Sequence, residues 1–326
     1  SCIANIELEN PIQTNKNIHP ILISDPDQMD KLYYKEDSFN LPKFASRHQL
    51  FISDFENSRD LTLFIMIWKA MLEDYIKDLV YKASEAELNL EILSHPKGLE
   101  IRFNGFDSSV IPFLIELKIK MQKFNSLSNS ENGIIELTNL FDVAKSKCKN
   151  KLDKRTKKEP YSITARSLEW IIVSGVESEL SLLNILENFE FNHYLIKLLN
   201  FSHTFISEGI IVGNLYRSEA IEVDFLIKEC FKLENSSLVN YNNILMNNIL
   251  KFDNQNIYQF KNLVLIKEEV NSCFLRYYQL KENKNHRDLL DVLGLCINNS
   301  FFEDLRTNQQ LGYAVNSFCV LKKSIW

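Results

Sequence analysis

The sequence predicts an α+β fold in which helices cover an antiparallel sheet, with this arrangement present twice and the second copy incomplete. Gly (8) and Pro (7) are scarce among the 326 residues, whereas barrels with many turns and low-complexity chains are rich in both. The first half of the chain shows strand, helix, hairpin and helix patterns in that order, which is typical of helices packed on one face of an antiparallel sheet. A similar order of strand, loop, long helix and strand returns near the C-terminal end and indicates an internal duplication.

The first copy is defined by its hydrophobic periodicity. Between residues 61 and 79, apolar side chains recur at three- and four-residue steps, the pattern of a helix with one buried stripe. Alternating apolar residues on both sides of His95-Pro96-Lys97-Gly98 predict a hairpin. The elements expected are a strand at 48–55, a helix at 61–79, hairpin strands at 88–92 and 99–103, and a helix that Ser108 or Ser109 caps and that ends near residue 124.

The rest of the chain sets the domain division. An Asn- and Ser-rich stretch at 235–256 lacks periodicity and is the best candidate for a boundary. We therefore predict a first domain at 1–235, a linker at 236–258, and the start of a second domain at 259–326 that is truncated if the first copy sets the domain size. The elements expected are helices over most of 134–199, a strand at 210–212, a helix from Ser218 to Phe231, strands around 263–265 and at 274–280, a helix at 286–309 that ends near Gly312, and strand character from Tyr313 and Val315 onward.

Charge and hydropathy exclude several classes of protein. The formal net charge of −6 argues against a dedicated nucleic-acid binder. The longest apolar run, at 61–68, is too short to span a membrane, and the first residues lack the pattern of a signal peptide. We expect a soluble protein, cytoplasmic rather than secreted, although the six dispersed cysteines leave the compartment open. The Lys- and Arg-rich run at 145–158 is expected to be a solvated helix face, and attraction of acidic segments is the alternative.

Residue patterns alone assemble no complete active site. The six histidines never come within four residues of each other, so the chain has neither H-E-x-x-H nor H-x-x-E-H. The cysteines form no C-x-x-C pair. There is also no G-x-S-x-G elbow, P-loop or G-x-G-x-x-G turn. We therefore expect no metal site and no cofactor in this chain.

One run near the C-terminal end is distinctive. The segment Arg306-Thr307-Asn308-Gln309-Gln310-Leu311-Gly312-Tyr313 resembles the R-T-x-x-Q-L-G-Y signature of the insulinase (pitrilysin-like, inverzincin) family of zinc metallopeptidases, and its insulysin-like members in particular. The resemblance spans almost the whole chain and is diffuse between residues 126 and 206. Further segments follow the family's order: Leu22-Ile23-Ser24-Asp25, Lys31-Leu32, Phe39-Asn40-Leu41-Pro42-Lys43, Glu87-Leu88, Gly213-Asn214, Asn271-Ser272-Cys273 and Tyr277-Tyr278-Gln279.

The resemblance implies four related α+β domains in two bowl-shaped halves that close around a peptide. It places an H-x-x-E-H zinc site with a distal Glu in the first domain and makes this chain the third domain plus the opening of the fourth. The implied partners are peptide substrates and the N-terminal catalytic half, and a homo-oligomer is left open. Arg306 and Tyr313 match the family's catalytic contacts from the second half, and the substrate-binding set is Arg306, Gln310, Leu311, Gly312 and Tyr313.

Two alternatives remain. A non-catalytic insulinase-like binding or structural subunit would retain the fold without cutting peptides. Gln309 stands where the family often has an acidic residue, a departure that leaves Arg306 and Tyr313 untouched. An unrelated α+β interaction domain is the other alternative, and burial of Arg306 and Tyr313 away from any cavity would favour it.

Overall fold

The computed structural model describes residues 19–27, 30–37, 41–52, 58–95, 98–173, 175–201, 205–231, 249–252, 256–261, 268–279, 286–317 and 319. These residues belong to two compact units. The first unit comprises residues 1–155 and 177–245, and the second comprises 156–176 and 246–326. The predicted linker at 236–258 lies mostly outside the described residues, so the predicted domain boundaries stay a prediction.

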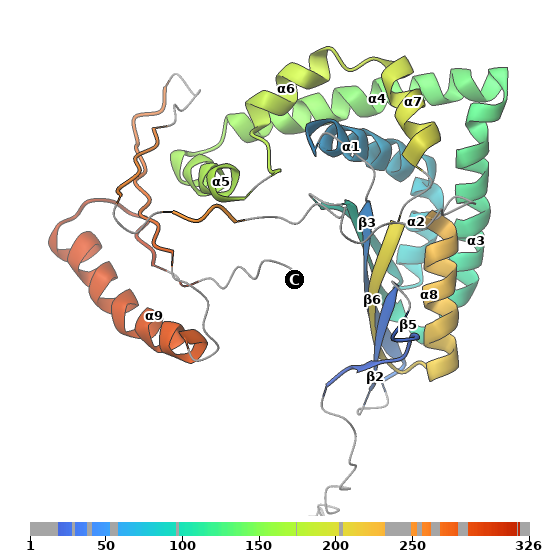
Figure 1. Ribbon diagram of the computed structural model, residues 1–326, viewed down its shortest axis with the longest axis horizontal. Coiled ribbons are helices and arrows are strands. Elements are labelled where there is room, and N and C mark those ends of the chain that lie inside the picture. Colours follow the sequence, from blue (N-terminus) through green and yellow to red (C-terminus); the bar gives the residue numbers. More distant parts are fainter. Residues whose placement is uncertain are drawn as a thin grey trace, which may run out of the picture. The chain divides into compact units, whose positions relative to one another are not determined.

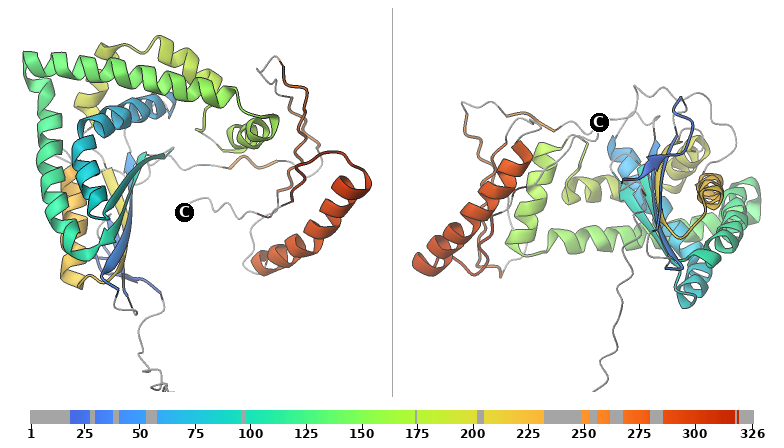
Figure 2. Two further views of the ribbon diagram at one scale, coloured as in Figure 1. Left: turned by 180° about the vertical axis from the view of Figure 1, so that it is seen from behind. Right: turned by 90° about the horizontal axis from the view of Figure 1, so that it is seen from below.

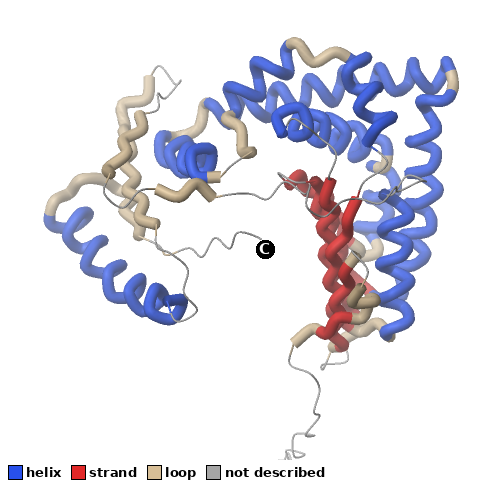
Figure 3. The backbone as a smooth tube through the Cα atoms, in the orientation of Figure 1, coloured by secondary structure: helices blue, strands red, loops and turns tan. Residues whose placement is uncertain are grey.

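A six-stranded sheet forms the centre of the first unit (Figures 1 and 3). Its strand order is β1-β2-β6-β3-β5-β4, and every neighbouring pair is antiparallel except β2 and β6, which run parallel. The prediction of a wholly antiparallel sheet therefore fails at this one pair, because β6 returns to the sheet after five intervening helices. The strands are β1 (Ile21–Leu22), β2 (Lys31–Glu36), β3 (Lys43–Ile52), β4 (Asn89–His95), β5 (Gly98–Phe106) and β6 (Phe205–Gly213).

The helices of the first unit lie on one side of this sheet (Figures 1 and 2). The predicted helix at 61–79 is confirmed as two helices, which break at Ile76. The α+β class and the hairpin at β4 and β5 are confirmed as well. The helices are α1 (Ser58–Tyr75), α2 (Lys77–Glu85), α3 (Asp107–Ser126), α4 (Glu131–Thr156), α6 (Glu179–Glu187), α7 (Phe191–Phe201) and α8 (Arg217–Phe231), with the short turn η1 (Leu127–Asn129) after α3.

Helix α1 is buried on both sides, whereas the sequence predicts one buried stripe. One side faces the sheet, and α4 and α7 cover the other side (Figure 2). The Phe64 ring stacks on Tyr194 of α7 at a centroid distance of 5.3 Å, and the Cys148 thiol of α4 donates to the Met66 carbonyl at 3.5 Å. The α1 residues that are almost fully buried are Leu61, Leu63, Phe64, Ile65, Ile67, Met71 and Leu72.

The second unit contains helices without a described sheet. It comprises α5 (Pro160–Ile172), the bridge between Val173 and Ile249, and α9 (His286–Phe302), which continues as the π-helical turn η3 (Glu303–Asn308). The helix predicted at 286–309 is confirmed. The strands predicted at 274–280 and from Tyr313 onward are wrong for the described parts of those segments. A strand requires a ladder partner, and no described segment pairs with them; residues 263–265 lie outside the described residues.

A buried polar network joins the sheet to α8. His48 of β3 is fully buried, and its Nε2 lies 3.1 Å from Oδ1 of Asp224. Lys228 approaches the other Asp224 oxygen at 2.7 Å. Burial alone would raise the pKa of Asp224, but the hydrogen bond to His48 and the charges of His48 and Lys228 outweigh it and lower that pKa. The space for the imidazole is provided by Gly209 on the adjacent strand.

Replacement of Gly209 by Ala tests this network. The new Cβ would lie 2.6 Å from Cδ2 and 2.7 Å from Nε2 of His48, so His48 must move away from Asp224. We expect Gly209→Ala to lower the free energy of unfolding by about 1–3 kcal/mol in urea titrations followed by circular dichroism. Gly312→Ala is the matched control, since no atom of the described residues other than its chain neighbours lies within 4 Å of the added Cβ. Equal stability of Gly209→Ala and the wild type would contradict the role of this contact.

Candidate functional site

The five predicted site residues lie together where α9 ends. The Arg306 guanidinium lies 4.9 Å from the centre of the Phe302 ring and 4.6 Å from the centre of the Tyr313 ring. Arg306 is therefore held between two aromatic faces, which attract a cation at such distances. Tyr313 is 86 % exposed, and Leu311 is also exposed. The arrangement places the exposed phenol of Tyr313 beside the guanidinium of Arg306, which is half-buried.

The chain turns at Gln310 rather than at Gly312. Gln310 has a φ of 52°, in the left-handed region, whereas Gly312 is absent from the residues with positive φ. The Leu311 N–H donates to the Leu305 carbonyl at 3.0 Å, and the Gln309 N–H donates to the Asp304 carbonyl at 2.9 Å. The prediction that Gly312 ends the helix is therefore wrong, because the widened last turn places the reversal two residues earlier.

Gln309 has a defined partner in this turn. Its Nε2 donates to Oδ2 of Asp304 at 2.8 Å. A carboxylate at position 309 would instead repel Asp304, since both groups would be negative. The amide is thus suited to the acidic neighbour that this chain carries.

The solvent-facing side of the sheet carries a second group of polar residues that the sequence analysis missed. Glu100 of β5 accepts from Arg102 Nε at 2.5 Å and from Arg47 Nη2 of β3 at 2.8 Å. Its side chain is 7 % exposed, whereas those of Arg47 and Arg102 are 53 % and 44 % exposed. Burial would raise the pKa of Glu100, but the hydrogen bonds and charges of both arginines prevail and lower it. Glu100 and Arg102, two residues apart in the strand predicted at 99–103, were the available signal, whereas Arg47 lies outside the strand predicted at 48–55.

The basic run at 145–158 and the two buried cysteines make contacts within the fold. In the basic run, Lys147 pairs with Asp74, Lys149 pairs with Glu187, and Lys145 donates to the Phe189 carbonyl. Burial raises the pKa of Cys148 to about 11 and that of Cys230 to about 12, which suppresses thiolate reactivity at both.

The described part of the chain offers no group of three His, Cys, Asp or Glu side chains that could hold a metal ion. A zinc ion therefore does not fit the residues at hand. Within the same part of the chain, no helix is both long and apolar enough to cross a bilayer.

Comparison with known proteins identifies the family. A sequence profile described as the middle or third domain of peptidase M16 matches residues 3–184. The chain belongs to the M16 peptidase family. It is 27% identical over 306 residues to the A-factor-processing enzyme of Saccharomyces cerevisiae and 22% identical over 311 residues to the insulin-degrading enzyme of Drosophila melanogaster. A putative zinc protease of Caenorhabditis elegans is 23% identical over 327 residues.

These matches cover most of this M16 chain but only a part of each relative. They span 91%, 92% and 95% of the chain, and 28%, 29% and 34% of the three relatives in the same order. The crystal structure of pitrilysin superposes with a TM-score of 0.65 at 14% identity, over 93% of this chain and 30% of pitrilysin. That similarity confirms the fold. The resemblance to the insulinase family is confirmed by the profile and by the relatives' names.

The charge of Glu100 gives a testable pH dependence for this M16 chain. A carboxyl group whose pKa is lowered by folding stabilises the fold above its ordinary pKa, and this contribution is lost as pH falls through the lowered value. Glu100→Gln should reduce the free energy of unfolding by about 1–2 kcal/mol at pH 7, a modest cost because both guanidiniums are half exposed.

The measurement is a series of urea titrations between pH 7 and pH 3. The difference between wild type and Glu100→Gln should shrink as the pH falls through the lowered pKa of Glu100, since the wild-type carboxylate then becomes protonated in the folded state as well. Glu85→Gln, at an exposed position on α2, is the control. A difference that does not change with pH would contradict the assigned charge state.

Proposed function

We propose that this chain is the C-terminal, non-metal half of an insulinase-type zinc metalloendopeptidase. Its role is to form part of a closed chamber and to supply contacts to the peptide during hydrolysis. Family membership and the names of the relatives support peptide hydrolysis. The observation that carries the proposal is the contact between the half-buried Arg306 and the exposed Tyr313, with the guanidinium 4.6 Å from the centre of the ring.

The chemistry of these two groups suits the proposed role. When water adds to a peptide carbonyl, the carbonyl oxygen gains negative charge. The Tyr313 hydroxyl and the Arg306 guanidinium can both donate hydrogen bonds to that oxygen. The Arg306 guanidinium stacks on the rings of Phe302 and Tyr313, which restricts it before the substrate arrives. Less side-chain entropy is therefore lost on binding. Gln310, Leu311 and Gly312 lie in the same turn and are proposed to contact the peptide backbone.

Zinc is proposed to reside in the N-terminal half, where it would activate the attacking water. Because the donors come from the other half, hydrolysis would require closure of the two halves around the peptide. The N-terminal half and the peptide are therefore the proposed partners, with a homo-oligomer as a further possibility. A cytoplasmic location is also proposed, in keeping with the free cysteines of the described residues.

A non-catalytic binding or structural subunit is the alternative function. It would use the same fold and the same chamber surface to hold a peptide without cutting it. The exposure of Tyr313 and the side-chain hydrogen bond from Gln309 to Asp304 show a well-formed turn and favour neither activity nor its loss. The presence or absence of an H-x-x-E-H motif in the N-terminal half distinguishes the two functions.

Removal of the Tyr313 hydroxyl in the full-length protein tests the proposed role. Tyr313→Phe should lower kcat for a fluorogenic peptide by about 10²-fold or more, the usual cost of losing one donor to a developing oxyanion. Zinc content should not change. Tyr216→Phe is the matched control, because Tyr216 is 77 % exposed beside α8 and should retain wild-type turnover. Unchanged turnover in Tyr313→Phe would overturn the assignment.

A further inference from the structure

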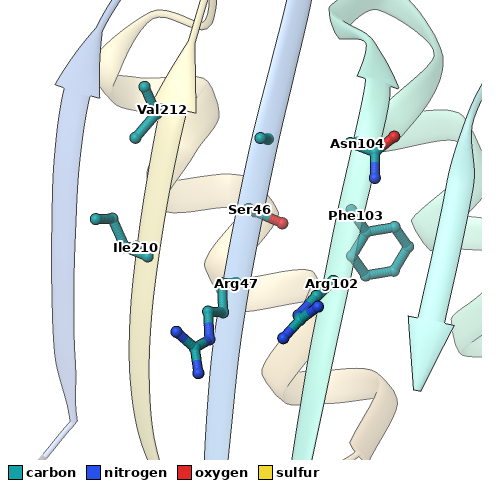
Figure 4. A pocket seen from close by; sticks show the side chains of 8 residues that line it. Ser46, Arg47, Arg102, Phe103, Asn104, Ile210 and Val212 are labelled. Atoms are coloured by element: carbon teal, nitrogen blue, oxygen red, sulfur yellow. The ribbon is translucent and has the colours of Figure 1, made fainter. Parts of the chain in front are cut away.

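The solvent-facing side of the sheet contains a shallow hollow of about 260 Å³ (Figure 4). Arg47 of β3 and Arg102 of β5 stand next to each other on this side. Ile210 and Val212 of β6 line the other border, and Ala45 on β3 is paired with Val212. The hollow therefore combines a cationic part and an apolar part, and all of it belongs to the first unit.

The two arginines are directly opposed across strands β3 and β5. Like charges at such positions repel each other, and Glu100 compensates by binding one nitrogen of each guanidinium. Glu91 is the only other acidic group paired with either arginine among the described residues, and it lies 3.7 Å from Arg102 Nη1. Arg47 donates to Glu100 through Nη2. Its other two guanidinium nitrogens make no hydrogen bond to the described residues. Two fixed guanidiniums with remaining donors form a site for a carboxylate.

Ile210 is paired with Arg47 in the arginine row, and the rest of the apolar part lies one row further along the sheet. Arg47 and Arg102 share one cross-strand row, and Ala45 and Val212 share the row two residues away. Residues two apart on a strand are separated by about 6.7 Å, since each residue rises about 3.3–3.4 Å. An extended peptide has the same spacing between side chains on one face. One peptide can thus place a carboxylate on the arginines and an apolar side chain on Val212.

We propose that this hollow binds an extended peptide segment in which an acidic residue and an apolar residue stand two positions apart. The acidic side chain bridges Arg47 and Arg102, and the apolar side chain packs on Ala45, Ile210 and Val212. This inference rests on the proposed function in one respect, which is that the bound peptide is taken to be a substrate of the chamber. It adds a preference for acidic segments that Arg306 and Tyr313 do not provide.

Binding of labelled peptides to the intact protein tests the proposal. The probes are fluorescein-labelled extended peptides that carry Glu-Ser-Val, Gln-Ser-Val or Glu-Ser-Ser in an otherwise identical sequence, followed by fluorescence anisotropy. We expect the Gln and the Ser replacements each to weaken binding at least fivefold. Because these changes are made in the ligand, they do not depend on the folding of any variant. Equal affinity for all three peptides would overturn the proposal.

Protein variants then locate the binding site. Arg47→Gln and Arg102→Gln should each remove the preference for Glu-Ser-Val over Gln-Ser-Val. Arg217→Gln is the matched control, since Arg217 is exposed on α8, and it should retain the preference. A preference that survives in both Arg47→Gln and Arg102→Gln, shown by circular dichroism to be folded, would place the carboxylate elsewhere. The assay needs no cleavage, so selective binding without hydrolysis would overturn the proposed function and leave this inference standing.

Discussion

The burial of α1 on both sides is the constraint on which the first unit depends. A helix with apolar side chains on two sides must be covered on both sides, and the sheet covers only one of them. Helices α4 and α7 provide the second cover through the contacts of Tyr194 and Cys148. The helices are thus gathered in layers on one face of the sheet, and the other face carries Arg47 and Arg102 together with Ala45, Ile210 and Val212. The hollow beside Arg47 and Arg102 exists because of this one-sided arrangement.

Both candidate sites use arginine in the same physical way. Arg306 is held by the rings of Phe302 and Tyr313, while Arg47 and Arg102 are held by the Glu100 carboxylate. In each case the neighbours occupy part of the guanidinium and leave further donors for a ligand. Restricting the side chain in advance lowers the entropy lost on binding. The first site is suited to charge that develops during a reaction, and the second to charge that a ligand already carries.

Periodicity was sufficient to predict the hairpin, α3 and α9, because the apolar residues of each element recur with the period of a strand or of a helix. It could not predict the second cover of α1, since Tyr194 and Cys148, which contact Phe64 and Met66, lie far away in the sequence. The parallel pair of β2 and β6 was missed for the same reason. The candidate site at Arg306 and Tyr313 was predicted from its signature and stays a prediction, whereas the turn at Gln310 depends on a π-helical end that no residue pattern indicated. Glu100 was missed because Arg47 lies on a different strand and Arg102 lies two residues away on the same strand.

The central claim is that this chain serves a zinc-dependent peptidase from the half that lacks the metal. The most direct measurement is hydrolysis of a fluorogenic peptide by the full-length protein before chelation, after chelation and after zinc is restored. The account predicts that chelation abolishes hydrolysis and that zinc restores it, with circular dichroism unchanged throughout. Absence of hydrolysis in the zinc-loaded protein, or hydrolysis that is insensitive to chelation, would contradict it.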